Sequence, residues 1–420
     1  MNVKYFYSFF ALLFVASFAV AQEKNGVDEW KKSVTVKSFK TFMKEKKYDK
    51  AKNEIDGAIS KYETAAHDPE MYMLKVSALN ELISQENRKI YLNSKPDTAK
   101  YFSLIKEQYD AGFDCFETEQ KLMSQQNGKG DKAKSKYKDD LANIVFPSRK
   151  KMLAAGKFYY VKKDYVKAFA YFSDYLDTKN SSLFVNKNDE IMTASENDLT
   201  EVSSLATLSA YASSNNKGVL TYLTESLKDK SIEEKLLEIG SKSAAAVGDS
   251  TEMVKMLENG FYSYPEVEYF YLALIKYYND HEQYENALAK SKKMTELYPD
   301  NRNYWYIRGK EELFLSKFDD ALASFNKCVE IKADDAEAFS AIGNIHLHYA
   351  HDKYEKMNLS LSDPNYSKKK AEINNSYNLA CENFEKARKF DENNKSLWID
   401  GLRETYFKLN KGKELKQLDK

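Results

Sequence analysis

Apolar residues recur at helical spacing between residues 265 and 343, and the pattern repeats after 34 residues. Shifting the stretch by that distance places Ala287 on Ala321 and Gly309 on Gly343. A fixed period of this length, with small residues at fixed places, is typical of a helical hairpin that recurs along a chain. Because one hairpin cannot bury its apolar face alone, we expect successive copies to stack.

The most complete copy opens with Trp305, and Gly309 follows four residues later. Its second helix carries Ala321, then Phe325 and Cys328 at intervals of four and three residues. This arrangement resembles the tetratricopeptide repeat (TPR), in which small residues let two antiparallel helices approach closely. The resemblance implies an all-α, TPR-like helical-hairpin solenoid, wound as a right-handed superhelix. It also implies a protein that binds other proteins or peptides and performs no catalysis.

The resemblance weakens toward the N-terminus, and it suggests three regions after the first 21 residues. We expect an N-terminal helical, TPR-like region at 22–147, degenerate helical repeats at 148–264, and regular repeats at 265–420. The polar stretch 87–100, which contains a proline, predicts a loop. The pair at 146–147, Phe-Pro, is expected to open a helical unit, because proline is tolerated in the first turn of a helix.

The period breaks after the helix that contains Phe339. The small residue expected at position 355 appears instead as Ala380, and Phe384 follows it at the usual spacing. We therefore expect an insertion at about 351–375, between the two helices of one hairpin. Insertions in solenoids lie on one face and often carry a particular function, although the sequence does not assign one here. The end of the chain, from Trp398, predicts a C-terminal capping helix.

The first residues have the three parts of a secretory signal peptide. Lys4 precedes an apolar run over 5–20, and the sequence Ala-Val-Ala at 19–21 is typical of a cleavage site. The apolar run is short for a membrane span, and no cysteine follows the site to take a lipid anchor. We expect residues 1–21 to be a signal peptide cleaved before Gln22. The mature protein is then expected to be soluble in the periplasm of a gram-negative bacterium, without a membrane span.

Composition excludes some partners. Lys and Arg together number 64, and so do Asp and Glu, so the whole chain offers no general attraction for nucleic acid. The 31 tyrosines have two readings, packing between helices or an adhesive binding surface. Three cysteines in 420 residues are no disulfide framework, and Cys328 stands at a small-residue position of the repeat.

The sequence contains little that indicates chemistry. It lacks the common zinc-protease, hydrolase and dinucleotide motifs, so we expect no catalytic residue and no cofactor. The segment His346–Asp352 is the one concentration of possible metal ligands. His348, His351 and Asp352 would share a helix face and could hold a metal, or could be incidental at a solvated helix end. We favour the second reading and expect no metal.

The TPR resemblance implies a partner site on the concave wall made by the first helices of the regular repeats. The residues at these positions are Tyr269, Leu272, Lys276, Asn279, Asn303, Tyr306, Lys310, Leu313, Glu337, Ser340, Asn344 and Leu347. Aromatic, aliphatic, amide and lysine side chains suit an extended peptide, so we expect a protein or peptide partner in the cell envelope. Three other readings stay open: a merely solvated helix face, an envelope glycan-binding or outer-membrane-complex accessory protein, and a metal-dependent protein.

We expect the protein purified from its host to begin at Gln22, because the leader ends in a small-residue cleavage site. Mass spectrometry of the N-terminal peptide from a periplasmic fraction tests this. A cytoplasmic pool that retains Met1 would contradict export.

Overall fold

The computed structural model describes residues 30–92, 94–95, 97–126, 134–187, 196–357 and 364–418. The predicted leader and its cleavage site lie outside these residues. The described chain is all-α, without strands, and its TPR-like hairpins form two compact units, Met1–Ser195 and Glu196–Lys420. The boundaries predicted at 147 and 264 are sequence-based and stay predictions.

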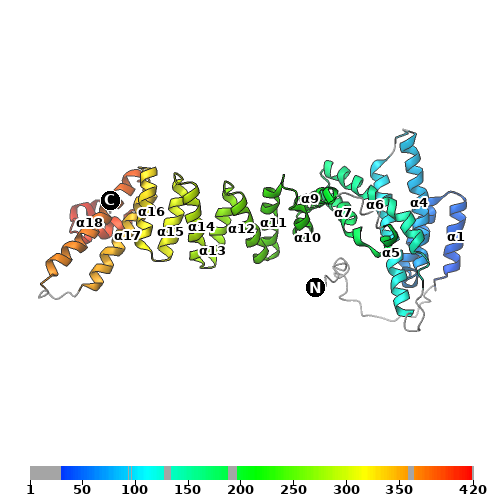
Figure 1. Ribbon diagram of the computed structural model, residues 1–420, viewed down its shortest axis with the longest axis horizontal. Coiled ribbons are helices and arrows are strands. Elements are labelled where there is room, and N and C mark those ends of the chain that lie inside the picture. The colour runs from blue at the N-terminus through cyan, green and yellow to red at the C-terminus, as the bar shows by residue number, and fades with distance from the viewer. Residues whose placement is uncertain are drawn as a thin grey trace. The chain divides into compact units, whose positions relative to one another are not determined.

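The first unit contains seven α-helices and two short 3₁₀ helices in its described part. They are α1 (Lys32–Lys44), α2 (Tyr48–Lys61), α3 (Glu63–Ala66), α4 (Pro69–Tyr91), α5 (Thr98–Gln126), α6 (Lys138–Val161), α7 (Tyr165–Asp177), η2 (Thr178–Asn180) and η3 (Ser182–Lys187). Consecutive helices pack against each other, and α5 and α6 are the longest of the set (Figure 1).

The second unit is a row of helical hairpins (Figure 1). Its helices are α9 (Glu196–Ala212), α10 (Asn216–Ser226), α11 (Glu233–Val247), α12 (Ser250–Ser263), α13 (Glu268–Asp280), α14 (Tyr284–Leu297), α15 (Arg302–Phe314), α16 (Phe318–Ile331), α17 (Ala336–Lys356), α18 (Tyr366–Phe390), η4 (Lys395–Leu397), α19 (Ile399–Lys408) and α20 (Gly412–Leu418). Each helix packs on the next, as expected for stacked repeats.

Glycine and an aromatic ring form the closest contact inside several hairpins. A Cβ atom placed on Gly309 of α15 would lie 2.8 Å from the Phe325 ring of α16. Phe384 of α18 is placed in the same way between Gly343 of α17 and Gly401 of α19. Since no side chain other than hydrogen fits there, the glycines let the two helices approach over the ring.

A shared turn closes seven of the hairpins. Its left-handed residue, with φ between 56° and 80°, stands two positions before the second helix: Lys46, Lys163, Ser214, Gly248, Glu282, Ser316 and Asn410. The next N–H donates to a carbonyl five residues earlier, as Lys317 does to Glu312 at 2.8 Å. This is a Schellman closure, which supplies partners for carbonyl groups at the end of the first helix.

Two local expectations are wrong. Pro147 does not open a helix but lies inside α6, where it removes one main-chain hydrogen bond. The helix continues through it because Val145, Phe146 and Ser148 are all buried. The stretch predicted as a loop at 87–100 is also shorter, since α4 runs on to Tyr91 and α5 begins at Thr98.

The predicted insertion corresponds to parts of α17 and α18, and the predicted capping helix corresponds to α19 and α20. Residues 351–375 include the end of α17 and the start of α18, so both helices of that hairpin are longer than those of the preceding repeat. From Trp398 the chain forms α19 and α20. Trp398, Leu402 and Tyr406 pack with Phe384 in one apolar cluster.

Ala321→Arg should destabilise the second unit by roughly 2–4 kcal/mol, because the side chain would overpack a filled core and carry a charge into it. Ala321 is fully buried beside Phe325, Ile342 and Ile345, between α15, α16 and α17. Thermal unfolding followed by circular dichroism measures the change. Ala323→Arg, on the exposed side of the same helix, is the matched control. Equal melting curves for the two variants would show that the register is wrong.

Candidate functional site

The twelve predicted partner-binding residues lie on α13, α15 and α17, the first helices of three consecutive hairpins. Their exposure differs. Six are exposed: Leu272, Lys276, Asn303, Lys310, Glu337 and Asn344. Four are partly buried: Tyr269, Asn279, Tyr306 and Leu313. Two are buried: Ser340 and Leu347. The assignment of this face as a partner site stays a prediction.

The α17 part of this face is partly covered by the chain itself. Ser340 donates a hydrogen bond of 2.5 Å to the carbonyl of Leu397, in η4. Leu347 packs in the C-terminal apolar cluster with Tyr377 and Leu402. Asn344 is exposed but donates to the Ser340 carbonyl on its own helix, at 3.0 Å. A partner could therefore reach the face most directly at α13 and α15.

The two tyrosines of the face are held by contacts within the protein. The Tyr269 hydroxyl lies 2.9 Å from Ser241 Oγ of α11, and Lys242 lies over its ring. The Tyr306 ring packs edge-on against Phe325 at 5.5 Å. Tyr269 is thus held between two hairpins and Tyr306 within one, and only part of each ring is left for a ligand.

The lysines differ in their partners. Lys276 pairs with Asp280 one turn further along α13, at 2.7 Å, and both side chains are well exposed. Such surface pairs contribute little to stability. Lys310, at the equivalent position of α15, makes no ion pair with any residue that the structure describes. It is the cation on this face most available to an anionic group.

Sequence reasoning missed a buried carboxyl group beside the face. Glu311 of α15 is almost fully buried and accepts a hydrogen bond of 2.9 Å from Asn279 Nδ2 of α13. Its Oε2 and the Asn279 Oδ1 have no partner. Burial raises the pKa of Glu311, against the hydrogen bond from Asn279, which lowers it. A protonated Glu311 could donate to Asn279 Oδ1 and would give both oxygens a partner.

A polar contact also joins α15 to the next hairpin. Arg302, at the start of α15, donates from Nη2 to Asp335 Oδ1 at 2.6 Å and to Glu337 at 2.8 Å, and a second bond runs from Nε to Asp335. Asp335 is buried and also caps α17 by accepting from Ala338 N. Glu337, one of the predicted site residues, is therefore exposed but already paired with an arginine of the preceding hairpin.

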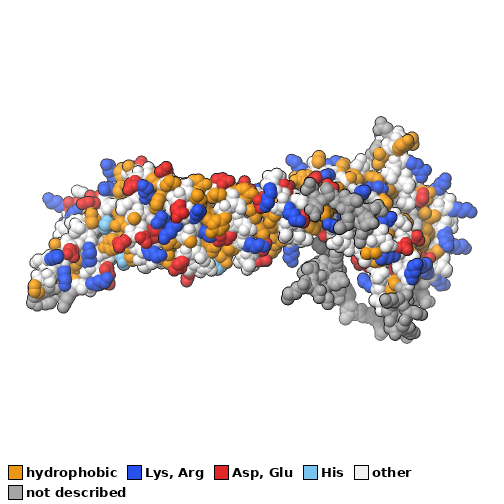
Figure 2. Space-filling view, in the orientation of Figure 1, with side chains coloured by type: hydrophobic (Ala, Val, Ile, Leu, Met, Phe, Trp, Pro, Cys, Tyr) orange, Lys and Arg blue, Asp and Glu red, His pale blue; other side chains and the backbone are white. Residues whose placement is uncertain are grey.

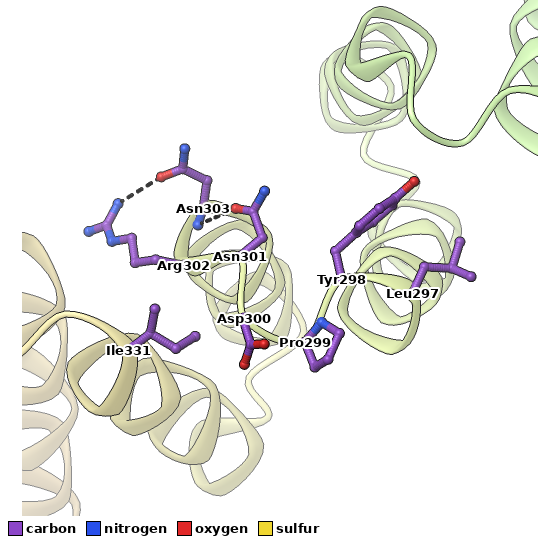
Figure 3. Close-up of a pocket in the computed structure, with 8 residues that line it drawn as sticks. All are labelled: Leu297, Tyr298, Pro299, Asp300, Asn301, Arg302, Asn303 and Ile331. Carbon is purple, nitrogen blue, oxygen red and sulfur yellow. Dashed lines mark hydrogen bonds between the residues drawn. The ribbon is translucent and has the colours of Figure 1, made fainter.

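An open hollow of about 570 Å³ lies at the edge of the face, between the ends of α14 and α16 and the start of α15. It is lined by Leu297, Tyr298, Pro299, Asp300, Asn301, Arg302, Asn303 and Ile331. Figure 3 shows Tyr298 and Leu297 on one side and Asn301, Arg302 and Asn303 on the other. Asn303 thus stands where the hollow meets the predicted groove.

The histidine segment does not assemble a ligand set. His348 stacks on the ring of Phe318, with 3.7 Å between centroids. His351 Nε2 lies 2.5 Å from Glu404 of α19, and Asp352 pairs with Lys356. Within the described part of the chain, no three His, Cys, Asp or Glu side chains are placed to hold a metal. Nor is any helix in that part long and apolar enough to cross a membrane.

Comparisons with known proteins find likeness only among solved structures. No protein-family model matches the chain, and no curated protein matches it. YrrB, a TPR protein with an unusual peptide-binding site, aligns at 16% identity and a TM-score of 0.33, covering 51% of this chain and 95% of its own. One MamA structure aligns at 16% identity and a TM-score of 0.30, covering 42% of this chain and 86% of its own. MamA from Desulfovibrio magneticus RS-1 aligns at 12% identity and a TM-score of 0.28, covering 43% and 95%.

Glu311→Gln should raise the melting temperature, and more at neutral pH than at acid pH. The raised pKa of Glu311 means that its contribution is fully present below the ordinary value of 4.5 and is lost as the pH rises through the folded-state pKa. Glutamine keeps a donor for Asn279 Oδ1 at every pH. Thermal unfolding across a pH series measures the effect, with the exposed Glu296→Gln as control. A gain that does not change with pH would contradict the shifted pKa.

Proposed function

We propose that the protein is a non-enzymatic scaffold of the periplasm, which holds a partner protein or peptide against the exposed face of α13 and α15. One observation carries the proposal: Leu272, Lys276, Asn303 and Lys310 are exposed in a row on two successive first helices. The opposite sides of these helices are packed, as Tyr271 and Tyr304 show by their burial.

The chemistry of the row suits an extended peptide. Leu272 offers an apolar contact, and the Asn303 amide can both donate to and accept from a peptide backbone. Lys276 and Lys310 supply positive charge one repeat apart, so a segment with acidic side chains would complement them. Such a mixture of apolar anchors, amides and charges is common in peptide grooves.

The proposal that the protein is exported is supported by its N-terminal leader and not by its helical fold. The basic start, the apolar run and the small residues at 19–21 support secretion.

The proposal is tested by photocrosslinking in the host cell. A photoreactive amino acid at Lys310 should form one main adduct with an envelope protein, whereas the same residue at Lys293, exposed on α14, should form none. Leu272→Ser with Lys310→Glu should weaken binding of the captured partner at least about tenfold, which corresponds to about 1.4 kcal/mol.

A third variant separates the groove from the long hairpin. It shortens α17 and α18 by removing residues from the end of α17 and from the start of α18. If this variant loses the partner while the Leu272→Ser, Lys310→Glu variant keeps it, the binding site is the hairpin and not the groove. Equal adducts at positions 310 and 293 would also overturn the proposal.

A further inference from the structure

One end of the first unit gathers the most exposed apolar side chains of the described chain. Tyr91 is 90% exposed, Val161 81% and Leu92 70%, and Val166 and Ile90 are exposed beside them in the sequence. A single exposed apolar residue needs no explanation, but a group of them marks an interaction site. Figure 2 shows hydrophobic side chains at the free end of α4, at the upper right of the view.

The fold brings these residues to the same end. Helices α4, α5 and α6 alternate in direction, so the end of α4, the start of α5 and the end of α6 lie together. Two contacts show this: Lys100 of α5 lies 3.4 Å from Glu86 of α4, and the rings of Phe102 and Phe158 lie 5.3 Å apart. The tip comprises five residues at these helix ends: Ile90, Tyr91 and Leu92 at the end of α4, Val161 at the end of α6, and Val166 at the start of α7.

Basic side chains surround the tip. The α4–α5 turn carries Arg88, Lys89, Lys95 and Lys100 against Glu86 and Asp97, and the α6–α7 turn carries Lys157, Lys162, Lys163 and Lys167 against Asp164. The acidic groups are already engaged. Glu86 pairs with Lys89 at 2.8 Å and Asp164 with Lys167 at 2.9 Å, and Asp97 accepts a hydrogen bond of 2.9 Å from the Lys100 backbone N–H. In a chain with equal numbers of acidic and basic residues, this end is distinctly positive.

We propose that the tip docks on the surface of a bilayer that contains anionic phospholipid. Exposed aliphatic groups and a tyrosine can enter the headgroup boundary, while the surrounding lysines and Arg88 meet lipid phosphates. A protein partner is less well matched, because lysine is depleted from protein interfaces. This surface lies in the first unit and does not depend on the groove of the second.

Vesicle binding tests the proposal with the chain that begins at Gln22. The chain should sediment with vesicles of phosphatidylcholine and phosphatidylglycerol, and much less with phosphatidylcholine alone. Tyr91→Ser with Leu92→Ser should weaken this binding about tenfold or more, because two apolar side chains lose their burial. Phe407→Ser is the matched control, since Phe407 is 68% exposed on α19 of the second unit.

The charge and the depth of insertion are tested separately. Lys162→Glu with Lys163→Glu should remove the preference for anionic vesicles, whereas Lys292→Glu with Lys293→Glu, on α14, should keep it. A nitrobenzoxadiazole label at Leu92→Cys should brighten several-fold on anionic vesicles, and one at Phe407→Cys should not; the native cysteines are buried.

Three outcomes would overturn the proposal. They are the absence of vesicle binding, equal loss of binding in the tip and Phe407 variants, and equal binding to neutral and anionic vesicles. A dimer in light scattering that Tyr91→Ser with Leu92→Ser abolishes, without any vesicle binding, would assign the tip to a second copy of the chain.

Discussion

The contact between an aromatic ring and a glycine sets how closely the helices of several hairpins approach. Phe325 lies over Gly309, and the same arrangement joins Phe172 to Gly156 in the first unit. The preceding repeat has Ile275 and Ser291 at the positions of Gly309 and Phe325, so the larger side chain there stands on the first helix instead. The total volume is conserved while its distribution changes, which cores tolerate well.

Apolar contacts hold each hairpin, and polar contacts add to those between neighbours. Arg302 reaches Asp335 of the next hairpin, Asn279 reaches Glu311, and Lys290 bonds Glu258 of the preceding one at 2.6 Å. Buried polar pairs have few alternative partners, so they favour one register of stacking over others. The proposed groove lies on the side of α13 and α15 that takes part in neither the apolar contacts within hairpins nor the polar contacts between them.

The sequence predicted the regular repeats well, because their small and aromatic residues recur at a fixed period. It placed Ala321, Phe325 and Cys328 in the core, where all three are buried. It did not predict the burial of Ser340 and Leu347, which depends on where the chain returns after the long hairpin. The prediction that Pro147 opens a helix was wrong, because the burial of the residues on both sides of it outweighed the preference of proline for the first turn of a helix. Glu311 was missed because a glutamate at a core position gives no signal distinct from a solvated one.

The seven shared turns have a consequence for how the chain folds. Only Gly248 among their left-handed residues is a glycine, so residue type does not mark the turn and the packing of the two helices must impose it. Since the turn is short, the contacts that close a hairpin join residues near in sequence, and low contact order favours rapid folding. During synthesis from the N-terminus, the chain could thus form each hairpin as soon as its two helices were available. It would not need to wait for any distant segment, which shortens the time that its apolar faces stay open to aggregation.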